Sequence, residues 1–122
     1  MFSCFQTFKA DKPVDADPIS VEQASRLHNR AGVEFVDPRP AEAIASTTGI
    51  IPGARNISLG DIKAGKLPPA FDDRSIHVVT ICQAGPMSAK AADLFSKLGF
   101  AEVSYVDGGT QAWLDAGLST VR

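Results

Sequence analysis

The sequence predicts an α/β fold in which a central, mostly parallel sheet carries helices on both faces. Short runs of apolar and β-branched residues, typical of buried strands, alternate along the chain with segments of good helix formers. This order requires crossover connections, which produce parallel sheets covered by helices. At 122 residues the chain is expected to form one domain over residues 18–122, after a loose lead-in over residues 1–17.

In the first half of the chain, polar residues mark the ends of the predicted helices. The predicted elements are a helix over residues 20–29, a strand over 33–37, a helix over 41–45, an extended piece over 55–57 and a helix over 58–65. Ser20 and Gln23 have the spacing of a capping box. Ser58 and Gly65 are expected to begin and end the 58–65 helix because of their residue types.

The second half is predicted to contain the central strand and the longest helix. The elements are a strand over residues 76–81, a helix over 86–98, a strand over 102–106 and a final helix between Gly109 and Gly117. Asp107 is expected to cap the final helix, and Trp113 to be a core residue. Parallel strands would bring Asp37, Cys82 and Asp107 to one edge of the sheet, where open α/β sheets bind ligands.

Cys82 is the most informative residue of the chain. It lies between the strand at 76–81 and the helix that begins near Pro86. A helix N-terminus carries unpaired N–H groups and the positive end of the helix dipole, so it favours a thiolate over a thiol. Such a thiolate is a nucleophile. An inert, buried cysteine is the alternative, and we expect this of Cys4 in the lead-in.

Composition excludes several classes of protein. The net charge of −2 indicates neither a nucleic-acid nor an anionic-membrane partner. No apolar run approaches the ~20 residues of a membrane span, and the N-terminus lacks the pattern of a secretory signal. The two cysteines provide neither a disulfide framework nor zinc-ligand spacing, so we expect no metal or cofactor, and a reducing, cytoplasmic setting.

The chain resembles the single-domain rhodanese, or sulfurtransferase, family over about residues 19–121. The segments that carry the resemblance are, in order, Phe35-Val36-Asp37-Pro38-Arg39, Gly49-Ile50-Ile51-Pro52-Gly53-Ala54, Cys82-Gln83-Ala84-Gly85-Pro86-Met87-Ser88 and Asp107-Gly108-Gly109-Thr110-Gln111-Ala112-Trp113. They look like the family's Asp-x-Arg segment, its Gly-His-Ile-Pro-Gly-Ala turn, its active loop Cys-x-x-Gly-x-x-Ser and its closing Gly-Gly-x-x-x-Trp segment. Ile50 stands where His is usual.

The resemblance implies a small three-layer rhodanese-like fold and persulfide chemistry. In that family the loop cysteine, here Cys82, attacks the outer sulfur of a small-molecule donor or protein persulfide. It holds that sulfur as a persulfide and passes it to a thiol or another nucleophilic acceptor, which is covalent catalysis. The residues expected to bind the substrate are Gln83, Ala84, Gly85, Pro86, Met87, Ser88 and Arg39. Asp37 is expected to give structural support. Arg39 is expected either to line the mouth of the pocket or, equally, to be a solvated or Asp37-paired residue.

The loop departs from the family pattern in its charge. Rhodaneses that use thiosulfate commonly carry Arg or Lys next to the cysteine and just before the Ser/Thr, where this chain has Gln83 and Met87. A dianionic donor would lose charge-assisted hydrogen bonds there, so we expect a neutral or larger persulfide donor instead. Ser88 is expected either to donate its hydroxyl to the bound sulfur or to cap the helix.

Two other functions are considered for the same fold. The phosphatases built on it need Cys-x5-Arg, and the arginine position is Ser88 here, which excludes phosphoryl transfer. A binding or redox-regulatory module with little turnover is the remaining alternative to the enzyme. His28 and His77 lie far in sequence from Cys82, and we expect both to be structural.

Overall fold

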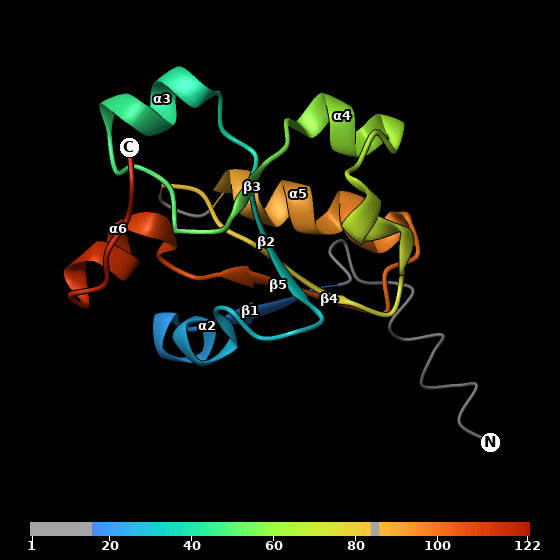
Figure 1. Ribbon diagram of the computed structural model, residues 1–122, viewed down its shortest axis with the longest axis horizontal. Coiled ribbons are helices and arrows are strands. Elements are labelled where there is room, and N and C mark those ends of the chain that lie inside the picture. Colours follow the sequence, from blue (N-terminus) through green and yellow to red (C-terminus); the bar gives the residue numbers. More distant parts are fainter. Residues whose placement is uncertain (1–15, 84–85) are drawn as a thin grey trace.

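The structure is a computed structural model that describes residues 16–83 and 86–122 (Figure 1). Its strands are β1 (Asp17–Ile19), β2 (Val33–Asp37), β3 (Arg55–Asn56), β4 (His77–Thr80) and β5 (Glu102–Val106). Its helices are α2 (Val21–Leu27), α3 (Ala41–Ser46), α4 (Leu59–Ala64), the 3-10 helix η1 (Pro69–Asp72), α5 (Pro86–Lys97) and α6 (Gly109–Asp115). The strands and helices therefore alternate as the sequence predicts.

The five strands form one sheet in the order β1-β5-β4-β2-β3. All neighbouring strands are parallel. Val36 of β2 lies opposite Thr80 of β4, and Thr80 lies opposite Tyr105 of β5. These three strands therefore end at the same edge of the sheet, and Cys82 follows the middle one, as predicted.

Helices cover both faces of the sheet, which confirms the three-layer α/β fold (Figure 1). On one face, α4, α5 and η1 enclose a core in which the rings of Phe71, Phe95 and Phe100 pack against one another. On the other face, α2 and α6 cover a second core that contains Phe35 and Trp113. None of the helices within the described residues has the length and apolar character that crossing a membrane requires.

The caps predicted for α2 and α4 are present. The Ser20 hydroxyl accepts a hydrogen bond from the Gln23 N–H at 3.1 Å, and the Gln23 side chain accepts one from the Ser20 N–H at 2.9 Å. At α4 the Ser58 hydroxyl accepts from the Asp61 N–H at 3.1 Å, and Gly65 closes the helix with a φ of 74°. The two serine hydroxyls satisfy N–H groups that have no partner within their helices.

The strand β1 is an element that the sequence does not predict. It contains three residues with Pro18 at its centre, and it pairs with β5 at the edge of the sheet. So short a segment has no alternating pattern, and proline is tolerated only on an edge strand. The predicted boundary between residues 17 and 18 falls inside β1. Residues 1–15 of the lead-in, which include Cys4, lie outside the described residues.

Two helix ends differ from the prediction. The helix α2 ends at Leu27, earlier than residue 29, because His28 is extended and Asn29 takes a φ of 66°. The capping role expected of Asp107 is wrong: the N-cap of α6 is Gly108, with a φ of 83°, and no side chain caps this end. The Asp107 N–H instead donates to the Ile19 carbonyl at 2.8 Å, where β5 meets β1.

Trp113 is a core residue, as predicted, and is 2% exposed. Its indole N–H donates to the Ser119 carbonyl at 2.9 Å, and its ring meets those of Phe35 and His28 edge-on. The His28 ring also lies edge-on to Phe35, and its Nε2 is 2.7 Å from the Pro52 carbonyl oxygen. These contacts agree with the structural role expected of His28.

Candidate active site

Cys82 follows the last residue of β4, Thr80, by two positions, at the edge where the central strands end. The Ile81 N–H donates to the Val36 carbonyl at 2.9 Å, so hydrogen bonding to β2 continues up to the residue before Cys82. The helix α5 then begins at Pro86, a residue suited to the first helical turn. Cys82 is buried, with an exposed fraction of 4%. The backbone arrangement of strand, cysteine and helix is therefore as predicted.

The first turn of α6 holds the cysteine loop in place. The Thr110 N–H donates to the Cys82 carbonyl at 2.6 Å, and the Gln111 N–H donates to the Gln83 carbonyl at 3.2 Å. Gly109 makes this approach possible, because a Cβ at this position would overlap the Cys82 carbonyl oxygen and would lie 2.6 Å from the Gln83 oxygen. Its φ of 65° also favours glycine. The loop is thereby attached to an element that follows it by more than twenty residues in the sequence.

Gly109 and Thr110 are residues of the site that the sequence analysis missed. The pair Gly108-Gly109 at the end of a strand was a signal of close backbone approach, but the sequence does not tell which backbone comes close. The Thr110 side chain is completely buried, and its hydroxyl has no hydrogen-bond partner within the described part of the chain. A buried hydroxyl in this condition lowers the stability of the fold.

The residues of the predicted substrate-binding loop differ from one another in their exposure to solvent. Gln83 and Pro86 are exposed, and Met87 is half-buried. Ala84 and Gly85, which were predicted to bind the substrate as well, lie outside the described residues. Gln83, Pro86 and Met87 therefore reach the surface next to Cys82 in the chain, where a substrate has access to them.

Ser88 is completely buried. It is the third residue of α5, so the alternative that Ser88 is the N-cap residue of this helix is wrong. The Ser88 carbonyl accepts a hydrogen bond from the Thr80 hydroxyl at 2.7 Å, which connects the first turn of α5 to the end of β4. The contact of its hydroxyl with a bound sulfur stays a prediction.

Asp37 and Arg39 form a buried ion pair, in which Asp37 is 0% exposed and Arg39 is 6% exposed. Arg39 Nη2 lies 2.7 Å from Asp37 Oδ2, and Arg39 Nε donates to Oδ1 at 3.0 Å. The guanidinium also donates to the hydroxyls of Thr47 and Thr48 and to the Gly49 carbonyl. These contacts agree with the structural role expected of Asp37. For Arg39 they favour the expected pairing with Asp37 over a contact with substrate.

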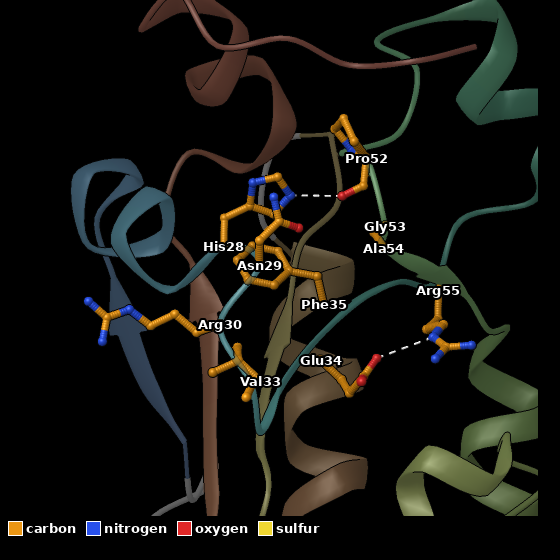
Figure 2. Close-up of a pocket in the computed structure, with 11 residues that line it drawn as sticks. His28, Asn29, Arg30, Val33, Glu34, Phe35, Pro52, Gly53, Ala54 and Arg55 are labelled. Carbon is orange, nitrogen blue, oxygen red and sulfur yellow. Dashed lines mark hydrogen bonds and ion pairs between the residues drawn. The ribbon is translucent and has the colours of Figure 1, made fainter.

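Two larger hollows lie on the α2 side of the sheet. Figure 2 shows the first, a space of about 630 Å³ between the chain after α2 and the turn that contains Pro52. Phe35 lies among its lining residues, and Arg55 forms an ion pair with Glu34 at 3.2 Å beside it (Figure 2). Neither Cys82 nor any other described residue of the cysteine loop lines this hollow.

The second hollow, of about 770 Å³, includes His77. Its Nε2 lies 2.8 Å from the Ser104 hydroxyl, and its Nδ1 lies 3.8 Å from a carboxylate oxygen of Glu102. Burial lowers the pKa of His77, and the nearby Glu102 charge opposes this shift only in part. His77 begins β4 and Cys82 follows its end, so these contacts agree with the structural role expected of His77.

Comparison with known proteins agrees with the fold and the motifs. The profile of the Rhodanese-like domain family matches residues 20–116. A relative named thiosulfate sulfurtransferase GlpE, from Pseudomonas putida (strain GB-1), is 34% identical over 98 residues, which cover 78% of this chain and 82% of the relative. The GlpE protein of Pseudoalteromonas translucida is 30% identical over 95 residues, covering 78% of this chain and 86% of the relative.

Solved structures show the same similarity. The human single-domain sulfurtransferase TSTD1 matches with a TM-score of 0.69 and 25% identity, covering 82% of this chain and 96% of that one. RPA3614 from Rhodopseudomonas palustris is a protein of unknown function named a possible tyrosine phosphatase. It matches with a TM-score of 0.77 and 27% identity, covering 86% of this chain and 84% of that one. The family profile spans most of the chain, and the motifs occupy the positions described above. This protein belongs to the rhodanese-like domain family.

Proposed function

We propose that this protein is a sulfurtransferase that carries sulfane sulfur as a persulfide on Cys82. The observation that supports this most is the setting of Cys82, at the common edge of the strands, with its carbonyl held by the Thr110 N–H. A helix N-terminus carries the positive end of the helix dipole, which stabilises a nearby anionic group. Relatives named sulfurtransferases support the same reaction class.

The proposed reaction has two balanced steps. The Cys82 thiolate attacks the outer sulfur of a donor R–S–SH, so that a bond forms between Sγ and that sulfur and the donor S–S bond breaks. The electron pair of the broken bond leaves with R–S⁻. A thiolate acceptor then attacks the outer sulfur of the Cys82 persulfide and restores the Cys82 thiolate. Each step exchanges one S–S bond for another, so no external oxidant or reductant is needed.

The donor we propose is a persulfide, of a small molecule or a protein, and the acceptor is a thiol. The GlpE relatives are named for thiosulfate, but Gln83 and Met87 give this loop no cation to hold a dianion. The buried Arg39 guanidinium is already paired with Asp37. A persulfide donor also fits the reducing, cytoplasmic setting that we propose, because thiols stay reduced there.

Phosphoryl transfer is not supported, although one structural relative is named a possible tyrosine phosphatase. The residue at the position of the required arginine is Ser88, which is uncharged and completely buried. Phosphoryl transfer requires a cation that stabilises the charge of the transferring phosphoryl group, and Ser88 does not supply one. The alternative that remains is a binding or redox-regulatory module that retains Cys82 but turns over weakly.

Intact mass spectrometry separates these alternatives. The reduced protein is incubated separately with thiosulfate, glutathione persulfide and polysulfide. We expect a gain of about 32 Da, one sulfur atom, with the persulfide and polysulfide donors. The gain should disappear in Cys82→Ser and persist in Cys4→Ser, the matched control. If the folded, reduced protein gains no sulfur from any donor, the enzyme is excluded and the binding module is left.

A further inference from the structure

A small hollow opens beside the cysteine loop. It has a volume of about 230 Å³ and is lined by Leu59, the first residue of α4, and by Pro86, Met87 and Lys90 from the first turns of α5. Met87 and Lys90 are three residues apart on a helix, so their side chains lie on the same face. The Cα atoms of Cys82 and Pro86 are at most about 14 Å apart, the reach of the chain between them. A donor with one arm in this hollow can therefore extend from Pro86 toward the cysteine.

The lining combines apolar side chains with one cation. The side chains of Leu59, Pro86 and Met87 are apolar, and the Met87 thioether adapts to the shape of a bound carbon chain. Lys90 is exposed, and no acidic side chain among residues 16–83 and 86–122 forms an ion pair with it. On the same helix Lys97 differs in this respect, because it pairs with Asp93 at 3.0 Å. The Lys90 ammonium is thus available to an anionic ligand.

We propose that Lys90 determines specificity by attracting the carboxylate of a small persulfide donor whose carbon chain occupies this hollow. The inference rests on the proposed persulfide function of Cys82 and adds the class of donor to it. The volume is below the roughly 300 Å³ of a site that encloses a whole ligand, so it accommodates one carboxylate-bearing arm. An ammonium attracts such a group as a point charge and demands no fixed geometry. The outer sulfur of the donor is then transferred to Cys82 as described above.

The test measures sulfur transfer to Cys82 as a function of donor concentration for two donors. Glutathione persulfide carries carboxylates, and the persulfide of 2-mercaptoethanol carries none. The variants are Lys90→Gln and Lys90→Glu, with Lys97→Gln as a control that makes the same charge change on the same helix. The readout is the mass gain on Cys82, from which the half-saturating concentration and the maximal rate are obtained separately.

We expect Lys90→Gln to raise the half-saturating concentration of glutathione persulfide about threefold to fivefold, the effect of one exposed charge pair. Lys90→Glu should raise it about tenfold, because repulsion replaces attraction. The maximal rate should not change, nor should either constant for the donor without carboxylates or for Lys97→Gln. Added salt should reduce the difference between Lys90 variants and wild type, since exposed charges are screened.

Two other outcomes distinguish failure of the Lys90 proposal from failure of the proposed function. If Lys90→Gln and Lys90→Glu take sulfur from glutathione persulfide with the wild-type constants, the role of Lys90 is refuted while the transferase function stands. If the wild-type protein takes sulfur from neither donor, the proposed function fails. The proposed role of Lys90 in donor specificity then fails as well.

Discussion

Replacement of Gly109 by alanine tests whether the attachment of the cysteine loop to α6 supports the site. A methyl group at Gly109 would overlap the Cys82 carbonyl oxygen and crowd that of Gln83, so these carbonyls must move away from α6. The hydrogen bonds that they accept from Thr110 and Gln111 would then be lost or lengthened. The substitution therefore acts on the loop backbone without changing the side chain of Cys82 or of any other loop residue.

The matched control is Gly117→Ala. Gly117 has a φ of 86° and has no atom within 4 Å of an added Cβ, so alanine there suffers only the backbone strain. That strain costs about 1 kcal/mol. Gly109→Ala adds the loss of the two hydrogen bonds at about 1 kcal/mol each. We therefore expect the free energy of unfolding to fall by about 3 kcal/mol in Gly109→Ala, against about 1 kcal/mol in Gly117→Ala.

Urea denaturation measures this difference in the free energy of unfolding. The unfolding midpoints of the two variants should differ by about 1 M. Sulfur uptake at Cys82, measured by peptide mass mapping under conditions where both variants are folded, should fall about 10- to 100-fold in Gly109→Ala alone, because small misplacements of a reacting group are costly. Equal midpoints together with wild-type sulfur uptake in Gly109→Ala would refute a supporting role for α6.

Further predictions concern the donor, the ion pair and buried polar groups. Met87→Arg should raise the rate of sulfur uptake from thiosulfate about tenfold or more, because a cation then faces the dianion; an unchanged rate contradicts the charge argument. Asp37→Ala should lower the free energy of unfolding by about 3–5 kcal/mol, since it leaves the Arg39 charge buried without its partner; a loss below about 1 kcal/mol in urea denaturation contradicts this. Thr110→Val should raise the free energy of unfolding by about 1 kcal/mol, because its hydroxyl is buried with no hydrogen-bond partner among the described residues; marked destabilisation would reveal a hydrogen bond. Burial lowers the pKa of His77 below its ordinary value of 6.5, so the unfolded chain binds the proton more readily. Stability should therefore be retained above pH 6.5 and decline as the pH falls below it, and a His77→Gln variant should show a weaker decline.

Local interactions were predictable from the sequence because they involve residues close together in the chain. The capping box joins Ser20 to Gln23, and the cap of α4 joins Ser58 to Asp61. The strands at 33–37 and 102–106 were predicted with their observed bounds, since five residues suffice to show a β-branched, apolar pattern. The position of Cys82 between a strand and a helix followed from the same local patterns.

Predictions failed where the conformation depends on distant residues. The strand β1 is extended because it pairs with β5, and its own three residues do not indicate a strand. Asp107 has a residue type that commonly caps helices, yet its N–H is directed to Ile19 by that same pairing. In both cases a contact between segments far apart in the sequence outweighed the local preference.

The sequence by itself determined the α/β class, the order of the elements and the loop that contains Cys82, because these follow from local periodicity, capping and turn residues. Only the tertiary structure decided that the first turn of α6 holds the carbonyls of Cys82 and Gln83, and that Arg39 is enclosed by Asp37 and the Thr47-Thr48-Gly49 segment. It also brought Leu59 against the face of α5 that carries Met87 and Lys90. The physical reason is that these contacts join elements whose separation is set by packing across the whole sheet, which no local pattern encodes.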